Sequence, residues 1–588
     1  MIWPYPRAKP ALLLLLVLGL LPASDKAEQP RQRATLRVGL WTLWHDSSAS
    51  LTPSGPGHSI RLRTCAGCAV VAVTQPASIR ATGNAIVVTA AGKARHASQF
   101  LIAAPVTLTA HGETLTLVWP LAVTARSGTL MMTVTMPVES YVSRVVASES
   151  DANDSEASLE ALSIVVRTFA LHQSHGHTAY DLCDSTHCQL VRWNAGAARL
   201  AMARAAALAT AGETLWFHGR PAVAYFGKDC GGYTASPAEI WPGARPLAYL
   251  PARPDSYGMR AGSHDWASEI SIGDLTAVLA AHRLARPGWQ TLTVVQRGPS
   301  GRAVTLQADS TSIPAEQFRL AVGESLGWNR LPSTWFEVSR AGDRFLFHGR
   351  GWGNGVGLCQ RGAAAMAAKG HSAAEILAQY FPGAEAADEA TGHAWHTFSG
   401  QGFLLESLDS ADAAYMPALA RARAEASQRS GLNAAVPFTV RAFASTPAFR
   451  NATLAPGWVA AFAEGGWIAT QPLRTLAARH LLDATLRHEF LHALVEGQAA
   501  ASTPLWLREG LVEFWSDAAH AQDAPPSLSF DAVDAALAHS STEEESARAH
   551  GAAAWYAARL LQRFGREKTL DWLRSGLPAS VADSLATR

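Results

Sequence analysis

The chain carries the stretch Leu486-Arg-His-Glu-Phe-Leu-His492, which decides how its C-terminal part folds. His488 and His492 are four residues apart, so on a helix both imidazoles lie on one face and can reach one metal ion. Glu489, between them, can polarise a water bound to that metal. The stretch therefore predicts a helix that carries the core of a zinc-dependent hydrolase. A helix whose histidines face solvent or serve the core is the alternative.

The second half of this pattern follows a break at Gly497, in the run Pro504-Leu-Trp-Leu-Arg-Glu-Gly-Leu-Val-Glu513. A catalytic zinc site takes three protein ligands and leaves a fourth position open for water. Glu509 is the candidate for the third ligand. Glu513 lies one helical turn further on, so we expect it to support a ligand or to face solvent. The two stretches together predict two antiparallel helices around one zinc site.

Length and charge exclude several classes of protein. The 588 residues are too many for one core, and with a formal net charge of +1 and no basic run, nucleic acid is not an expected partner.

Residues 1–27 combine Arg7 and Lys9 with the apolar run Ala11–Leu21, a pattern typical of a signal peptide. A buried helix or an uncleaved anchor is the alternative. We expect an exported protein, periplasmic or in the cell envelope or outside it, with no membrane span after signal removal.

The six cysteines can form disulfides in an exported chain. The stretch Cys65-Ala-Gly-Cys68 predicts either a local disulfide or free thiols. Cys183, His187 and Cys188 lie within six residues, and they are ligand types that zinc accepts. They predict either a zinc site, with Cys230 as a fourth ligand, or a Cys183–Cys188 disulfide.

The first part of the chain, residues 34–137, is predicted to be rich in β-strands, because apolar runs alternate with Gly, Pro and Ser clusters. The expected strands are Thr35–Trp41, Ala69–Val73, Ala85–Thr89, Phe100–Ala103, Thr114–Trp119 and Thr129–Thr135. The pattern then changes to helices. A short helix is predicted over Val138–Glu149, and a long amphipathic helix over Glu156–His172.

The remainder is predicted as a second domain over residues 138–384, an acidic and Ala-rich linker at 385–400, and a third domain over 401–588. The third domain should be mostly helical with a small sheet. Its expected elements are a helix at Met416–Arg429, a strand at Phe438–Phe443, two strands within Trp458–Gln471, and closing helices at Ala552–Phe564 and Lys568–Leu573. The predicted fold class is therefore α+β, in several domains.

Four motifs across residues 35–384 resemble the stage II sporulation protein D (SpoIID) / LytB amidase-enhancer family. They are Pro137-Val-Glu-Ser-Tyr-Val142 with Ser148-Glu149, Leu159-Glu-Ala161 to Arg167-Thr-Phe-Ala170, Cys230-Gly-Gly-Tyr-Thr234, and Gly351-Trp-Gly353 to Gln360-Arg-Gly-Ala363 with the closing Tyr380-Phe-Pro-Gly383. Members of this family include lytic transglycosylases. The resemblance implies an α+β domain that acts on peptidoglycan glycan strands.

The same resemblance implies that Glu149 is the catalytic residue. One carboxyl group can protonate the glycosidic oxygen and then, as a carboxylate, take the proton of the sugar's own 6-hydroxyl. It further implies substrate-binding roles for Arg167, Tyr233, Asn354 and Gln360. Asn354 stands where the family usually has His, and an amide cannot shuttle a proton near neutral pH. The domain therefore either cleaves glycan or binds it without cleavage.

The order of elements in residues 401–588 resembles the gluzincin peptidases of the peptidase MA-like group, in which an edge strand runs beside the cleft. The resemblance implies that His488, His492 and Glu509 hold Zn2+ and that Glu489 is the general base. We predict an exported cell-wall protein whose SpoIID-like domain is fused to a zinc peptidase acting on wall peptides or wall proteins. The alternative is a non-catalytic peptidoglycan-binding protein that recruits or enhances a cell-wall amidase and carries a degenerate zinc domain.

Overall fold

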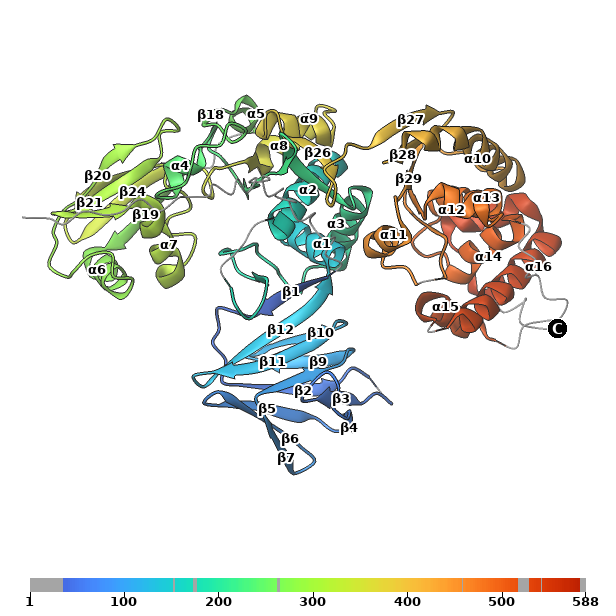
Figure 1. The fold of residues 1–588 in the computed structure, drawn as a ribbon, viewed down its shortest axis with the longest axis horizontal. Helices are drawn as coiled ribbons and strands as arrows, with labels where there is room; N and C mark the ends of the chain where they lie inside the picture. Colours follow the sequence, from blue (N-terminus) through green and yellow to red (C-terminus); the bar gives the residue numbers. More distant parts are fainter. Residues whose placement is uncertain are drawn as a thin grey trace, which may run out of the picture.

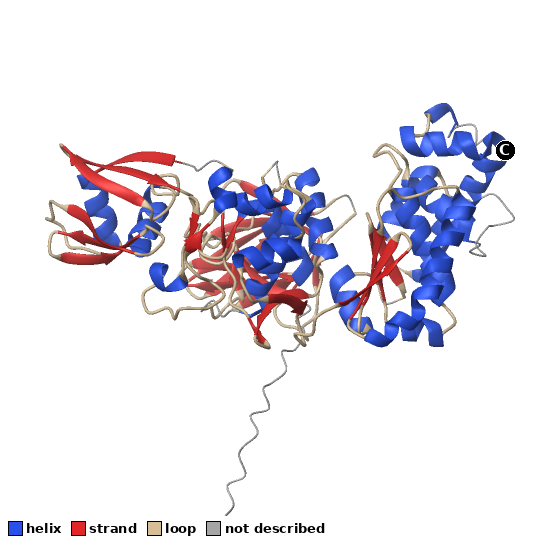
Figure 2. Cartoon of the chain, turned by 90° about the horizontal axis from the view of Figure 1, so that it is seen from above, coloured by secondary structure: helices blue, strands red, loops and turns tan. Residues whose placement is uncertain are grey.

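The structure is a computed structural model, and it describes residues 35–55, 57–151, 154–172, 177–261, 265–456, 458–516, 528–540 and 542–581. It is a multidomain α+β protein (Figures 1 and 2). The predicted signal peptide lies outside the described residues. Within the ranges described, none of the helices combines the length and the hydropathy that crossing a bilayer requires.

Two packed sheets make up the β-rich part, at the bottom of Figure 1. A seven-stranded sheet has the order β13-β1-β12-β11-β8-β3-β4, and a six-stranded sheet has the order β10-β9-β2-β5-β6-β7. Their strands are β1 (Thr35–Leu40), β2 (Ser48–Pro53), β3 (Ile60–Arg63), β4 (Val71–Val73), β5 (Ala77–Thr82), β6 (Ala85–Ala90), β7 (Lys93–Ala97), β8 (Gln99–Ile102), β9 (Val106–Ala110), β10 (Glu113–Leu117), β11 (Leu121–Arg126), β12 (Thr129–Pro137) and β13 (Leu182–Cys183).

Each of the six strands expected here is present, but the prediction missed β2, β3, β5, β7, β9 and β11. Strand β2 shows why. Its sequence Ser-Ala-Ser-Leu-Thr-Pro has few of the residues that favour strands, yet Ala49 and Leu51 face the core in alternation. Pairing with β5 and β9 forms this strand in spite of its weak local preference.

A cluster of helices lies above the sheets in Figure 1. Helices α1 (Val138–Glu149) and α2 (Glu156–His172) begin and end where the sequence predicts. The surrounding elements are α3 (Ala197–Ala209), β14 (Glu213–Phe217), β15 (Arg220–Pro221), β16 (Phe226–Gly227), β17 (Tyr233–Thr234), α4 (Pro237–Ile240), β18 (Arg253–Pro254), α5 (Ser256–Arg260), β25 (Leu358–Cys359), α8 (Gln360–Ala367), α9 (Ala373–Tyr380) and β26 (Glu385–Asp388).

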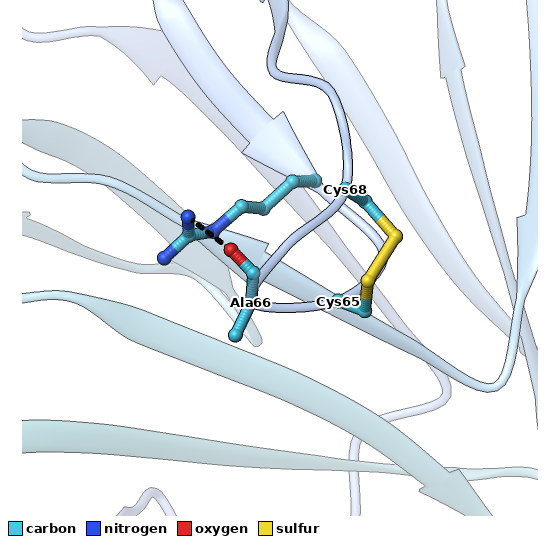
Figure 3. Close-up of a disulfide and its surroundings, with 4 residues drawn as sticks. Cys65, Ala66 and Cys68 are labelled. Carbon is cyan, nitrogen blue, oxygen red and sulfur yellow. Dashed lines mark hydrogen bonds between the residues drawn. A yellow bond between two sulfur atoms is a disulfide. The ribbon is translucent and has the colours of Figure 1, made fainter.

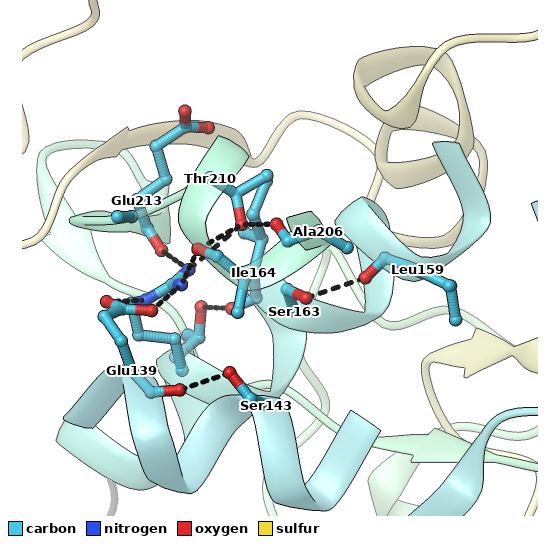
Figure 4. A network of polar contacts seen from close by, with 12 residues as sticks. Glu139, Ser143, Leu159, Ser163, Ile164, Ala206, Thr210 and Glu213 are labelled. Carbon is cyan, nitrogen blue, oxygen red and sulfur yellow. Dashed lines mark hydrogen bonds and ion pairs between the residues drawn. The ribbon is translucent and has the colours of Figure 1, made fainter. Parts of the chain in front are cut away.

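A buried ion pair joins α1 to α2. Arg167 is fully buried and donates through Nε to Glu139 Oε1 at 2.9 Å and through Nη2 to Glu139 Oε2. Its remaining donors reach the main-chain oxygens of Ala207 and Glu213 (Figure 4). Because every nitrogen of the guanidinium has a partner, the cost of burying the charge is offset.

An inserted lobe interrupts the predicted second domain, at the left of Figure 1. Two three-stranded sheets and two helices enclose a hydrophobic core of their own. The elements are β19 (Asp265–Ser271), α6 (Ile272–Ala281), β20 (Leu292–Arg297), β21 (Ala303–Ala308), β22 (Thr311–Pro314), α7 (Ala315–Leu326), β23 (Phe336–Ala341) and β24 (Arg344–Arg350). The sequence predicted a single domain over residues 138–384, without a separate core inside it.

The C-terminal part is a five-stranded sheet, of order β27-β28-β29-β31-β30, covered by helices. Its elements are β27 (His396–Gly400), β28 (Phe403–Ser407), η1 (Ser410–Tyr415), α10 (Met416–Ser430), β29 (Phe438–Ala442), α11 (Thr446–Thr453), β30 (Ala461–Glu464), β31 (Trp467–Thr470), α12 (Leu473–Ala478), α13 (Leu482–Glu496), α14 (Leu505–Ser516), α15 (Phe530–His539) and α16 (Glu543–Ser575). The two expected closing helices are both present within the span of α16, because Gly565 between them has a non-helical backbone conformation (φ 75°, ψ 167°).

The predicted linker, residues 385–400, is mostly strand. Strand β26 pairs with β14 and β27 pairs with β28, so only the residues between them connect the two parts. The acidic, Ala-rich composition gave no strand signal, and pairing with neighbouring strands decides the conformation.

The two halves of the chain meet around Arg441 on β29. Its side chain is 3% exposed and binds Glu406 Oε2 at 2.7 Å, within its own sheet, and Glu213 Oε1 on β14. It also donates to the main-chain oxygen of Ala211 at 3.0 Å. Around it, Leu208 pairs with a hydrophobic cluster that includes residues of α11 and β31. This interface fixes the C-terminal part against the helical part.

Arg441→Met should weaken that interface strongly. Two partly buried carboxylates would lose their buried counterion, and breaking a buried pair costs about 3–5 kcal/mol. In calorimetry, we expect the C-terminal part to unfold at a lower temperature and in a transition of its own. The matched control is Arg204→Met, which removes a half-exposed ion pair with Glu464 at the same interface and should cost at most about 1 kcal/mol. Equal effects of the two variants would contradict the role given to Arg441.

Candidate functional site

Glu149 is the last residue of α1, where the chain leaves the helix through Ser150 in an extended conformation. The side-chain amide of Gln360, at the start of α8, donates to the main-chain oxygen of Glu149 at 3.2 Å. The first and last of the SpoIID-like motifs, 211 residues apart in sequence, therefore meet at the predicted catalytic residue. The other polar atom of Gln360, Oε1, is buried and has no partner within the described ranges.

The surroundings of Glu149 favour its protonated form. Burial raises the pKa of its carboxyl group to about 7, and Arg192 and Lys228 oppose this rise. A carboxyl group with a pKa near neutrality can serve as a general acid at neutral pH.

The other predicted substrate-binding residues divide into two groups. Tyr233 and Asn354 are partly exposed; Tyr233 begins the short strand β17, and Asn354 lies in the glycine-rich loop before β25. Asn354 uses its side-chain oxygen to accept the backbone N–H of Val356 at 2.8 Å, so it shapes the loop that carries it. Arg167 is fully buried and bound to Glu139, which excludes contact with a substrate in this conformation. The prediction for Arg167 is therefore corrected: its motif is the core of the helical part.

A second cluster contains the predicted ligands Cys183, His187 and Cys188. The sulfur atoms of both cysteines lie 3.7 Å from His187 Nδ1. His177 completes the group, with Nε2 at 3.2 Å from Cys188 Sγ, and the four ligand atoms all lie within 4.8 Å of one another. The hydrogen bond between the two thiols lowers the pKa of Cys183, to about 4, and raises that of Cys188.

Asp184 holds the loop of this cluster in place. It is buried and accepts hydrogen bonds from the backbone of Trp41 (2.6 Å) and of Thr42 (3.1 Å), next to β1. Trp193 Nε1 donates to the same carboxylate at 3.0 Å. The loop is therefore preorganised by the sheet edge.

Cys230, expected as the fourth ligand, lies elsewhere. Its backbone N–H donates to Cys359 Sγ, 3.2 Å away, and the fourth residue of the Cys183 cluster is His177 instead. His177 escaped the sequence prediction because it precedes the cysteine pair by six residues, outside the segment considered. Of the two alternatives for Cys65 and Cys68, the structure has the disulfide (Figure 3).

The third cluster brings together the two C-terminal stretches. On α13, His488 Nε2 and His492 Nε2 are 3.0 Å apart. On α14, Glu509 Oε2 lies 3.5 Å from His492 Nε2. Gly510 allows α14 to pack closely on α16, because a Cβ atom there would lie 2.2 Å from the main-chain oxygen of Ala553.

Strand β30 is the outer strand of the C-terminal sheet, antiparallel to β31, and α13 packs against it. The helix with the two histidines therefore lies beside an edge strand, the arrangement that the gluzincin resemblance implies.

Burial dominates the electrostatics of this cluster. It lowers the pKa of His488 and of His492 to about 4 each, so both imidazoles are neutral at neutral pH. It raises the pKa of Glu489 to about 8, helped by the nearby Glu509 and Glu513. A cation bound among these groups would favour the carboxylate forms instead.

His550 on α16 is a member of the cluster that the sequence prediction missed. Its Nδ1 lies 2.9 Å from Glu513 Oε1 and 3.9 Å from Glu509 Oε2. Burial alone would raise the pKa of Glu513, but the hydrogen bond with His550 lowers it. Glu513, one helical turn after Glu509, therefore holds His550 beside Glu509. No motif contains His550, so only the packing of α14 on α16 reveals it.

Comparison with known proteins finds two family models that match the chain. Residues 126–217 match the Stage II sporulation protein family (SpoIID), and residues 255–357 match a domain of unknown function (DUF8618). The chain is similar to stage II sporulation protein D of Bacillus subtilis, with 25% identity over 265 residues that cover 42% of this chain and 74% of that protein.

Two further relatives share a comparable level of identity. An amidase enhancer of Bacillus subtilis is 23% identical over 291 residues, which cover 41% of this chain and 39% of that protein. An uncharacterized protein of Brachyspira hyodysenteriae is 25% identical over 263 residues, 44% of this chain and 69% of that protein. The SpoIID part of the predicted resemblance is therefore supported, whereas the gluzincin part stays a prediction.

The raised pKa of Glu149 predicts how stability responds to pH. The folded state keeps this proton up to a pH of about 7, and the unfolded state releases it near 4.5, so the free energy of unfolding falls as the pH rises between these values. At pH 8, Glu149→Gln should therefore raise the free energy of unfolding by about 1–3 kcal/mol, with little change at pH 4.

Urea denaturation of both proteins at the two pH values measures this effect. The matched control is Glu156→Gln, an exposed glutamate at the start of α2, which should change stability by less than about 1 kcal/mol. A Glu149→Gln variant that is no more stable than the wild type at pH 8 would show that the carboxyl group is not held in its protonated form.

Proposed function

We propose that this chain is an exported protein of the cell envelope that cleaves peptidoglycan glycan strands at Glu149 and hydrolyses peptide bonds at a zinc site in its C-terminal part. The observation that carries the first activity is the position of Glu149: its carboxyl group has a pKa near neutrality, and two SpoIID-like motifs meet there. The names of the relatives, stage II sporulation protein D and amidase enhancer, agree with a role at the cell wall.

In the glycan reaction, Glu149 acts twice. Its protonated carboxyl group donates to the glycosidic oxygen as the bond to the leaving sugar breaks. The resulting carboxylate takes the proton of the 6-hydroxyl group, whose oxygen closes the anhydro ring, so no water enters the reaction. Gln360 Oε1, buried and unpartnered, is placed to accept a hydrogen bond from a sugar hydroxyl.

The donor set of the C-terminal cluster fits zinc. Two neutral imidazoles present nitrogen atoms 3.0 Å apart, and the Glu509 carboxylate adds an oxygen 3.5 Å from one of them. Zinc held by His488, His492 and Glu509 would supply a Lewis acid that activates water. Glu489 is the base that takes the proton of that water. Among the described residues, β30 pairs with a strand on one side only, so its other edge offers main-chain groups to which an extended peptide can bind as an added strand.

The cysteine cluster also fits zinc, in a structural role. His177, Cys183, His187 and Cys188 supply two nitrogen and two sulfur ligands, which leave no position for water. A Cys183–Cys188 disulfide would not account for the two imidazoles that lie beside the sulfur atoms, so we favour the metal.

Asn354 favours a second candidate function for the first site. Its side chain is engaged in a turn of its own loop and cannot transfer a proton near neutral pH. If the reaction needs a histidine at this position, the domain binds glycan and presents it to a separate amidase.

Incubation with peptide-free glycan strands distinguishes these two functions. The proposal predicts products with anhydro-sugar ends, at a rate that falls as the pH rises above about 7, because Glu149 then loses its proton. Glu149→Gln should reduce the rate by about 100- to 10,000-fold. Asp151→Asn, at an exposed carboxylate two residues away, is the matched control and should stay active. Glycan that is bound but never cleaved would instead support the second function.

Metal analysis tests the two zinc sites independently of any activity. We expect two zinc ions per chain, of which one is lost in His488→Ala/His492→Ala and the other in Cys183→Ser/Cys188→Ser, because each double variant removes two ligands of one site. Cys230→Ser is the control and should keep both. Full zinc content in either double variant would show that those residues are not the ligands.

A further inference from the structure

Cys230 and Cys359 lie together at the base of the inserted lobe. Each is 2% exposed, and their sulfur atoms are within 4.8 Å of each other. The backbone N–H of Cys230 donates to Cys359 Sγ at 3.2 Å. Neither residue is part of the two zinc sites proposed above.

Main-chain pairing holds the two cysteines in this position. Strand β16 pairs in parallel with β25, with Gly227 opposite Cys359. A second bridge joins Asp229 to Trp352, with hydrogen bonds of 2.7 and 3.0 Å in the two directions. Main-chain pairing therefore holds the two cysteine backbones close together on both sides of the pair.

The surroundings of the pair disfavour a metal ion. Asp229 could add a third ligand, but its carboxylate already accepts from Gly231 N at 2.7 Å and from Arg361 at 3.1 Å. A second guanidinium, that of the fully buried Arg302, donates to the main-chain oxygen of Cys230 at 2.7 Å. The Asp229 carboxylate is thus already engaged, which leaves the two sulfur atoms as the free donors of this group.

A neutral cross-link suits this place better. Sulfur atoms joined in a disulfide carry no charge, so they need no counterion in a buried position. The compartment expected for an exported chain also permits such a bond.

We propose that Cys230 and Cys359 form a second disulfide of this protein, by exchange with an oxidised dithiol. The thiolate of Cys359 attacks the oxidant's disulfide and releases one of its sulfur atoms as a thiolate. The thiol of Cys230 donates to Asp255 Oδ2 at 3.1 Å, which is placed to take its proton. The Cys230 thiolate then attacks Cys359 Sγ and releases the second sulfur atom. The protein loses two electrons and two protons, and the oxidant becomes a dithiol.

The bond would close a loop between residues 129 apart in sequence, and this loop contains the whole inserted lobe. Long loops lose the most chain entropy in the unfolded state when they are closed, so the bond should stabilise the folded state. It would also fix the start of α8, where Gln360 contacts Glu149. The inference depends on export, but on neither of the proposed activities.

Thiol mapping of the full chain tests the bond directly. The purified protein is unfolded, refolded with zinc in a mixture of reduced and oxidised glutathione, then denatured with a chelator, alkylated and digested. We expect a cross-linked pair of peptides containing Cys230 and Cys359, with Cys183 and Cys188 alkylated. Alkylation of Cys230 and Cys359, or cross-links between either of them and another cysteine, would overturn the proposal. Because the oxidant is supplied, a protein that is not exported gives the same result.

A melting experiment with and without a thiol reductant gives a second readout. The reductant should lower the melting temperature of the wild type, and this shift should be lost in Cys230→Ala and in Cys359→Ala. Cys65→Ser/Cys68→Ser is the matched control, because it removes the short local disulfide and should keep the shift. A shift that persists in both single variants would also overturn the proposal.

Discussion

Two buried arginines that meet at Glu213 hold the molecule together. Arg167, on α2, binds Glu139 at the start of α1 and the main-chain oxygen of Glu213. Arg441, on β29 of the C-terminal part, binds the side chain of the same glutamate. Each guanidinium is buried and its carboxylate partners are buried or partly buried, so removing one member leaves a charge in a poorly solvated place. The set orients α1, which ends at Glu149, and it also orients the sheet against which the two-histidine helix packs. Both candidate active sites therefore depend on one network, and neither half of the chain is free to turn on the other.

The two sites use burial in similar ways. Loss of solvent raises the pKa of Glu149 to about 7 and that of Glu489 to about 8. For Glu149 this shift gives a proton donor that works without a second carboxylate, which suits a reaction in which the sugar's own hydroxyl attacks. For Glu489, the raised pKa describes the cluster without a bound cation. A cation beside Glu489 would lower this pKa again and favour the carboxylate, the form that a general base needs. Burial thus makes Glu149 a proton donor near neutral pH, whereas Glu489 needs a bound cation to act as a base.

The sequence predicted the elements whose signals are local. Helices α1 and α2 have their apolar residues at helical spacing and end where expected, and the two C-terminal stretches form the predicted pair of helices. It failed where tertiary contacts decide. Strand β2 exists because its neighbours pair with it, and residues 385–388 form β26 against β14. The sequence also did not indicate which distant residues lie together. His177 and His550 reach their clusters only in the folded chain. Arg167 belongs to the core, although its motif suggested a binding site.

The two proposed zinc sites differ in their chemical settings: one is structural and the other lies beside a glutamate base. Anomalous diffraction from crystals of the full chain, recorded on both sides of the zinc absorption edge, shows whether both sites bind zinc. We expect two peaks per chain, one among His177, Cys183, His187 and Cys188 and the other among His488, His492 and Glu509. If crystals grown with zinc show no peak among His488, His492 and Glu509, these residues do not hold the metal.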